Sequence, residues 1–277
     1  MCTIGAVFTH QNITTFKQCD LIASTVFHPP QQGHGSNGVK QYTAMTREGS
    51  AGIWAGMNDH GVAFVAADAY TTTAANYAAS SAQVNALFAA YEKTVSAFTS
   101  AQAAAESLIQ FYRSGCAGQP FPAPDISLIS GWLDAARTRP VCILIEYMPN
   151  PFNQDPVRTI VRNEGFFVST NNFRLQPNAV DYPANHSTYL RLQRAEMLLQ
   201  AQPTTQGVLQ LLQDQYYGAT ELSICRETDY IGTEFRTQAT AVFEAQSLQV
   251  HYQINGNPRN NPLQRWHHAF AESAVAA

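Results

Sequence analysis

Residues 1–20, MCTIGAVFTHQNITTFKQCD, hold the pattern on which the predicted fold depends. The segments 3–9 and 17–27 are rich in β-branched and apolar residues, so each predicts a strand, and residues 10–14 between them predict a hairpin turn. A cysteine directly behind the initiator methionine is an uncommon start for a buried strand. Because methionine aminopeptidase removes Met1 when the second residue is small, we expect Cys2 to become the N-terminal residue.

An N-terminal cysteine is a nucleophile that carries its own base. Its α-amine has an ordinary pKa of about 7.7–8.0, so it is partly neutral near neutral pH and can take a proton from the thiol. Cysteine at position 2 also occurs by chance, and a buried cysteine usually acts as a small hydrophobic residue. The position of Cys2 alone therefore leaves a catalytic role and a packing role open.

The rest of the chain alternates between strand and helix patterns. Apolar residues three and four apart predict helices over 81–113, broken near 99–100, and over about 187–217, broken at Pro203. Strands are predicted over 51–70 as a hairpin, 125–147, 158–173, 221–227, 237–245 and 248–256. The Pro and Gly content of 27–40 predicts a loop. The interleaving indicates one mixed domain over 1–265, followed by a loosely ordered tail at 266–277.

The composition excludes several classes of partner. With 277 residues and 45% hydrophobic composition, the chain can bury a large core. Only 13% of residues are charged and the net charge is -4, so no basic surface for nucleic acid or anionic lipid is expected. No segment approaches the roughly 20 apolar residues of a membrane span, and no signal-peptide pattern is present. We therefore expect a cytoplasmic protein that binds neither nucleic acid nor a membrane.

The cysteines and histidines show no metal or disulfide pattern. The chain has five cysteines, an odd number with no C-x-x-C pair, so free thiols are expected and no metal or other cofactor is predicted. Cys225 with His251 is an alternative nucleophilic pair, but both lie in predicted strands with no indication that they meet. His251, His267 and His268 lack the cysteine or carboxylate that would complete a metal site.

Five segments resemble, in chain order, the N-terminal-nucleophile hydrolases of the penicillin acyltransferase and choloylglycine hydrolase group. MCT at 1–3 carries the cysteine, and FKQCDL at 16–21 stands where the group has G-R-N-x-D-[WF]. GMNDHGVAF at 56–64 is similar to the hairpin G-M-N-E-x-G-L-A-V, and GFFVSTNNF at 165–173 is similar to V-T-N-[HN]-F/P. SICRE at 223–227, with the strand pattern that follows it, resembles the I-C-R-H tail of the penicillin acyltransferases.

This resemblance implies an α+β fold, the four-layer αββα sandwich, in which two antiparallel sheets face each other between layers of helices. It implies that Cys2 is the nucleophile, that Asp20 orients the Cys2 amine and that Asn171 donates its side-chain amide to the oxyanion. A second oxyanion donor, a backbone N–H, falls near Thr72 by position. The implied reaction is cleavage of a non-peptide linear C–N amide bond through a Cys2 acyl-enzyme.

The chain departs from the group at three positions. Lys17 replaces an arginine, which keeps the charge but loses the bidentate geometry. In the segment that corresponds to S-R-F-x-R, Thr188 stands at the first arginine and Arg191 at the second. Glu227 replaces the histidine of I-C-R-H. The changes at Lys17 and Thr188 leave the cationic pair of the group incomplete, which points away from bile salts and penicillin V as substrates. We assign Lys17 and Arg191 to the catalytic site, and Thr188 and Asn172 to substrate binding.

Three functions remain open on the sequence. An acyl-enzyme could pass its acyl group to water, as in an amidohydrolase, or to an amine, as in an acyltransferase. The departures at Lys17, Thr188 and Glu227 also fit a non-catalytic member that binds an acylated ligand. We expect a small-molecule amide or acyl substrate, and the group leaves a homo-oligomer open.

Overall fold

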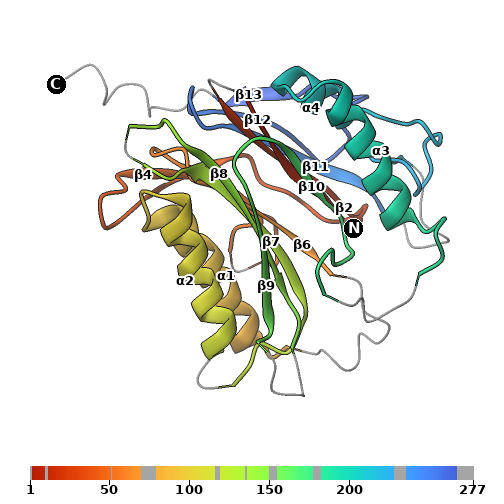
Figure 1. Cartoon of the computed structure of the whole chain (residues 1–277). Helices are drawn as coiled ribbons and strands as arrows, with labels where there is room; N and C mark the ends of the chain where they lie inside the picture. Colours follow the sequence, from red (N-terminus) through yellow and green to blue (C-terminus); the bar gives the residue numbers. More distant parts are fainter. Residues whose placement is uncertain are drawn as a thin grey trace.

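A computed structural model of the chain shows two facing β-sheets with helices on both outer sides (Figure 1). The structure describes all residues except 1, 10–11, 51, 70–78, 116–118, 135, 150–154, 177–181, 228–234 and 267–277. Neighbouring strands pair antiparallel in both sheets. The predicted α+β class and the αββα layering are confirmed.

The sheet that carries Cys2, the first sheet below, has six strands in the order β10-β1-β2-β11-β12-β13. Their bounds are β1 Cys2–Phe8, β2 Ile13–Ile22, β10 Gly165–Ser169, β11 Phe235–Glu244, β12 Gln249–Ile254 and β13 Gln264–Trp266. The second sheet has seven strands that follow each other in chain order. Their bounds are β3 Gln31–His34, β4 Gln41–Met45, β5 Ala55–Asn58, β6 Ala63–Asp68, β7 Asp125–Trp132, β8 Pro140–Tyr147 and β9 Val157–Arg162.

Two pairs of helices cover the outer faces of the sheets. Helices α1 Ser81–Ser96 and α2 Ala101–Ser114 cover the second sheet, and α3 Ser187–Ala201 and α4 Thr205–Leu211 cover the first (Figure 1). The predicted break between α1 and α2 is confirmed. Helix α2 starts after this break because the side chain of Ser100 accepts a hydrogen bond from the N–H of Ala103 and so caps its N-terminus.

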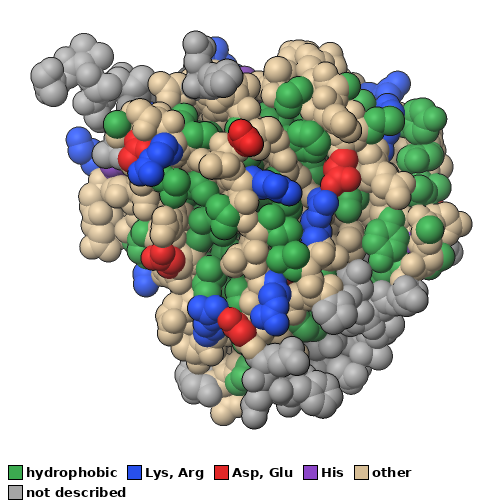
Figure 2. Space-filling model, viewed as in Figure 1, with side chains coloured by type: hydrophobic (Ala, Val, Ile, Leu, Met, Phe, Trp, Pro, Cys, Tyr) green, Lys and Arg blue, Asp and Glu red, His purple; other side chains and the backbone are tan. Residues whose placement is uncertain are grey.

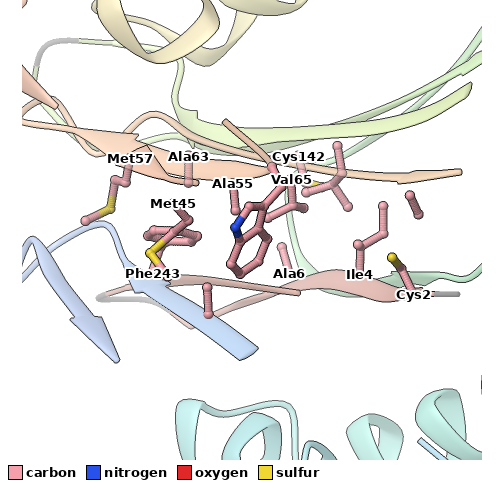
Figure 3. Packing of buried hydrophobic residues seen from close by; sticks show 14 of the residues in the cluster. Cys2, Ile4, Ala6, Met45, Ala55, Met57, Ala63, Val65, Cys142 and Phe243 are labelled. Carbon is pink, nitrogen blue, oxygen red and sulfur yellow. The ribbon is translucent and has the colours of Figure 1, made fainter. Parts of the chain in front are cut away.

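Three apolar layers hold the sandwich together: one between the sheets, one between the second sheet and helices α1 and α2, and one between the first sheet and helices α3 and α4. The layer between the sheets contains alternate residues of β1, Cys2, Ile4, Ala6 and Phe8, packed against residues of the second sheet such as Val65 (Figure 3). The other face of β1 contributes Val7 to the layer under α3 and α4. Both faces of β1 lie against other layers of the protein, and every residue of the strand is therefore buried.

The β5–β6 hairpin shows why the GMNDHGVAF segment has its sequence. The side-chain oxygen of Asn58 accepts from the N–H groups of His60 and Val62 at 3.0 Å each, and its amide donates to the carbonyls of Val95 and Phe98. One side chain therefore fixes the turn and attaches it to the end of α1. The predicted hairpin is confirmed.

Two predicted elements are wrong. The segment 27–40, predicted as a loop, contains β3, an exposed edge strand that pairs with β4 through its backbone alone. An edge strand needs no apolar side chains, so composition gives no signal for it. The segment 221–227, predicted as a strand, forms turns and bends. Its apolar residues Ile224 and Cys225 are buried under the first sheet without joining it.

The predictions for the cysteines, metal sites, membrane spans and the tail can be compared with the structure only over the described residues. Cys2, Cys19, Cys142 and Cys225 are free thiols, and Cys116 lies outside the described residues. Across the described residues, no three His, Cys, Asp or Glu side chains are grouped to hold a metal ion, and no helix is long and apolar enough to cross a membrane. Of the predicted tail, Trp266 ends β13, and residues 267–277 lie outside the described part. On the face in view, charged side chains of both signs lie scattered (Figure 2).

Candidate active site

Cys2 is the first residue of β1, between β10 and β2, and its side chain points toward the second sheet (Figure 3). The residue is 3% exposed. The register pairs Cys2 with Cys19 on β2 and Ile4 with Ser169 on β10. Strand pairing on both sides therefore fixes the direction in which the thiol points.

The backbone of Cys2 is held by two side chains from distant parts of the chain. Its N–H donates to Oδ1 of Asn171 at 2.9 Å, and its carbonyl accepts from Nη1 of Arg191 at 2.7 Å. Nη2 of Arg191 donates to the same Oδ1 of Asn171 at 2.9 Å. Arg191 is fully buried on α3. The structure thus brings together three of the residues that the sequence predicted for the catalytic site.

The amide of Asn171 is oriented by its partners. Two donors meet at Oδ1, so that atom must be the acceptor, and Nδ2 donates to the carbonyl of Asp68 at 2.7 Å. The sequence predicted that Nδ2 donates to an oxyanion. In this structure that donor is bonded to a backbone carbonyl, and the oxygen of the same amide holds the Cys2 N–H.

The segment that carries Asn171 is fixed at both ends. Thr188 accepts from the N–H of Asn171 at 3.1 Å, and the hydroxyls of Thr170 and Thr188 both donate to Oδ1 of Asn172. Thr188 and Asn172, predicted to bind substrate, are both buried, and these contacts use their polar atoms within the turn. They shape the segment that positions Asn171.

Glu146, which the sequence did not single out, holds the other end of this segment. Its carboxylate accepts from the backbone N–H groups of Arg174, Leu175 at 2.9 Å and Gln176 at 3.1 Å. Burial raises the pKa of Glu146, and these hydrogen bonds partly offset the effect. A buried glutamate within the predicted strand 125–147 was the signal that could have found it.

Lys17 lies on the thiol side of β2. Its Nζ donates to the carbonyls of Ala66 at 2.5 Å and Trp54 at 3.3 Å, and it lies 5.3 Å from the centre of the Trp54 ring. The residue is 5% exposed. Two carbonyls and an aromatic face therefore hold a buried cation in the layer between the sheets, on the same side of β2 as Cys19.

Cys19 lies directly opposite Cys2, with 4.0 Å between the two sulfur atoms. A hydrogen bond from the Cys19 thiol, together with the positive charge of Lys17, lowers the pKa of the Cys2 thiol from 9.0 to about 6, against the opposing effects of burial and Asp68. The same pairing raises the pKa of Cys19. The two shifts have opposite directions, so Cys2 is the more easily ionised of the two thiols.

Asp20 and Arg226 form a fully buried ion pair on the opposite face of β2. Nη2 of Arg226 lies 3.1 Å from Oδ2 of Asp20, and the Thr237 hydroxyl donates to Oδ1 at 2.7 Å. The sequence predicted that Asp20 orients the Cys2 amine. The Asp20 carboxylate instead contacts Arg226 and Thr237 on the helix-facing side of the sheet. The group that accepts from the Cys2 N–H is Asn171.

Arg226 was missed as a site residue, although it stands in the SICRE segment that carried part of the resemblance. Its signal was an arginine directly after the apolar residues Ile224 and Cys225, and a buried arginine needs an acid as partner. Glu227, at the histidine of the group pattern, accepts from Nε2 of Gln215 at 2.7 Å. Thr72, the predicted position of a second oxyanion donor, lies outside the described residues.

Comparison with known proteins gives similar folds and no similar sequences. No family model and no curated protein sequence matches the chain. The conjugated bile acid hydrolase of Clostridium perfringens, solved with the cysteine at its second position replaced by alanine, is 13% identical over 98% of both chains, with a TM-score of 0.54.

Two further solved structures extend this similarity. Penicillin V acylase of Agrobacterium tumefaciens is 12% identical, with 92% of this chain and 83% of that chain covered and a TM-score of 0.50. The Caenorhabditis elegans ortholog of N-acylethanolamine-hydrolyzing acid amidase is also 12% identical, with 88% and 93% covered and a TM-score of 0.50. At this level of identity the similarity establishes the fold alone, and the chain therefore has the same αββα fold as these three proteins.

Proposed function

We propose that the protein is a cysteine amidohydrolase that cleaves a linear, non-peptide C–N amide bond through an acyl-enzyme on Cys2. The observation that carries this proposal is the arrangement around Cys2. Its backbone is held by Asn171 and Arg191, and its thiol faces Cys19 with a lowered pKa. A nucleophilic thiol with a fixed direction at the start of a strand is the arrangement that this chemistry needs.

The environment also favours a neutral amine on Cys2 once Met1 is removed. Arg191 bonds the same Asn171 oxygen as the Cys2 nitrogen, so a fixed positive charge lies close to the amine. A neighbouring like charge disfavours protonation and lowers the pKa of an amine. The neutral amine can then take the thiol proton, which is the role of base in the proposed reaction.

The proposed reaction has two steps. The Cys2 sulfur attacks the amide carbonyl carbon while the amine takes the thiol proton. This proton then goes to the leaving nitrogen as the C–N bond breaks and a thioester forms. Water attacks the thioester with the amine as base, which releases a carboxylic acid and restores the thiol. If an amine attacks in place of water, the same acyl-enzyme makes the protein an acyltransferase.

Asn171 is the proposed side-chain donor to the oxyanion, with a backbone N–H near Thr72 as the second. In this proposal Nδ2 of Asn171 exchanges the Asp68 carbonyl for the substrate oxygen, while Oδ1 keeps its bonds to Arg191 and the Cys2 nitrogen. One well-placed donor lowers such a barrier by about 2.7–4 kcal/mol. The substrate class rests on the names of the three solved proteins, and the low charge of the chain favours a small or apolar acyl group.

The proposal is tested by intact mass and by a substrate screen on the purified full chain. Loss of Met1 and preferential alkylation of Cys2 at a sub-stoichiometric level of reagent are expected first. N-acyl amides are then screened for release of the free amine, with and without an added amine acceptor. Cys2→Ala should abolish release, whereas Cys142→Ala, at a buried cysteine elsewhere between the sheets, should retain it. Retained Met1 with an unreactive Cys2 would contradict the mechanism.

A further inference from the structure

In the proposed hydrolysis Cys19 acts only through its contact with Cys2. The pairing of β1 with β2 nevertheless fixes its position opposite Cys2. It stands opposite Cys2 in the β1–β2 ladder, both residues are 3% exposed, and their sulfurs are 4.0 Å apart. Both side chains belong to the layer between the sheets. The register of the backbone therefore holds the two thiols face to face.

This register allows a covalent bond between the two sulfurs. Residues directly opposite in an antiparallel pair have Cα atoms about 4.5–5.5 Å apart, depending on the type of pair. Disulfides form at Cα separations of about 4.4–6.8 Å, so the backbone need not move. The sulfurs must approach from 4.0 Å to a bond of about 2.05 Å, which rotation of the two side chains can supply.

We propose that Cys2 and Cys19 form a reversible peroxide-sensitive pair, in which Cys19 resolves oxidised Cys2 as a disulfide. In the first step the Cys2 thiolate attacks hydrogen peroxide, which forms a sulfenic acid and releases hydroxide. In the second step the Cys19 sulfur attacks the Cys2 sulfur, the S–S bond forms, and water leaves with the Cys19 proton. The two thiols together lose two electrons and two protons, and peroxide is reduced to two waters.

The consequence for the site is a closed and protected nucleophile. With its sulfur bonded to β2, Cys2 cannot attack a carbonyl, and it is also shielded from irreversible oxidation to the sulfinic acid. A dithiol reductant restores both thiols by exchange. The effect on turnover rests on the proposed role of Cys2 as nucleophile, whereas formation of the disulfide does not.

The remaining described cysteines are poor competitors for this reaction. Burial raises the pKa of the Cys142 thiol above its ordinary value, and burial raises that of Cys225 to about 12. Thiolates are the reactive species, so both thiols are protonated and unreactive near neutral pH. Cys142 lies in the same apolar layer as Cys2 but on β8 of the second sheet, which makes it the matched control.

The test is mass spectrometry of the full chain after treatment with a few equivalents of hydrogen peroxide and quenching with an alkylating reagent. We expect the wild type to lose about 2 Da, to give a cross-linked peptide joining Cys2 and Cys19, and to regain alkylation of both after dithiothreitol. Cys142→Ala should behave as the wild type. Cys19→Ser and Cys19→Ala should instead gain oxygen at Cys2, which dithiothreitol does not remove once the sulfinic acid has formed.

The wild-type result decides the inference even if both Cys19 variants fail to fold. Accumulation of oxygen on Cys2 with Cys19 still alkylated would overturn it, and so would a disulfide between Cys2 and any other cysteine. No substrate enters this experiment. A chain that forms the disulfide but cleaves no amide would contradict the proposed hydrolase and leave the thiol pair standing, and the reverse result would do the opposite.

Discussion

Lys17 and Asp20 lie on the same strand, β2, and face opposite sides of the first sheet. The ammonium of Lys17 lies with the two thiols between the sheets, and the carboxylate of Asp20 lies under the helices, paired with Arg226. Two residues of the same motif, FKQCDL at 16–21, therefore serve different partners. Lys17 acts on the Cys2 thiol by its charge, and Asp20 holds the segment that carries Arg226.

We expect Lys17→Met to move the reactivity of Cys2 to higher pH. The Lys17 charge is one cause of the lowered Cys2 pKa, so its removal should raise that pKa by about one unit. Because alkylation requires the thiolate, the midpoint of its pH profile should rise from about 6. The measurement is the rate of Cys2 alkylation against pH, with Lys40→Met, at an exposed lysine, as the control. An unchanged midpoint would show that Lys17 is only structural.

Substitutions at Cys19 should separate its hydrogen bond from its volume. Cys19→Ala removes the donor that is the largest cause of the lowered Cys2 pKa, so the alkylation midpoint should rise above 6. Cys19→Ser keeps a hydroxyl donor of nearly the same size, and its midpoint should lie between those of the wild type and Cys19→Ala. Equal midpoints in the two variants would contradict a role for the hydrogen bond. Circular dichroism before titration confirms that each variant is folded.

We expect substitutions that break the Asp20–Arg226 pair to lower the free energy of unfolding and to change the reactivity of the Cys2 thiol little. Asp20→Asn leaves the buried guanidinium of Arg226 without its counter-charge, and breaking a buried pair in this way costs about 3–5 kcal/mol. Thr237→Val removes the neutral donor to Asp20 and the acceptor of the Arg226 N–H, at a cost of about 1–3 kcal/mol, without removing a charge. Both are measured as the free energy of unfolding in urea. A loss in Asp20→Asn no larger than in Thr237→Val would show that the charge pair contributes little.

The sequence singled out residues that lie together in the structure, but it did not predict their contacts. Cys2, Asn171 and Arg191 were identified from motifs far apart in the chain, and the fold brings them within hydrogen-bond distance. The direction of the Asn171 amide could not be predicted, because it depends on the carbonyl of Asp68 and the arginine fork, which only the folded backbone places. A motif fixes which residue type is present and not which of its atoms faces Cys2.

Register explains why Cys19 was not recognised as the partner of Cys2. The second strand was predicted to begin at residue 17, whereas β2 begins at Ile13 because Thr14 and Thr15 also pair with β1. Without the true start of β2, the residue opposite Cys2 cannot be determined, since a shift of one residue turns every side chain to the other face. The αββα layering, by contrast, was implied by the resemblance to a known group and not by the periodicity of the elements, and it is confirmed.

Glu146→Gln should change how stability depends on pH. Burial raises the pKa of Glu146 above its ordinary 4.5, so the folded state binds its proton more tightly than the unfolded state does. The favourable contribution is complete below pH 4.5 and is lost as the pH rises through the pKa of Glu146 in the folded state, so the free energy of unfolding falls over that window.

The buried Asp125, whose pKa burial also raises, contributes in the same direction. Glu146→Gln should therefore flatten part of this fall and Asp125→Asn another part, as measured by urea unfolding over a pH series that starts below 4.5 and rises from there. A pH profile in Glu146→Gln that parallels the wild type would mean that Glu146 is equally easy to ionise in both states, and that its three backbone hydrogen bonds fully offset its burial.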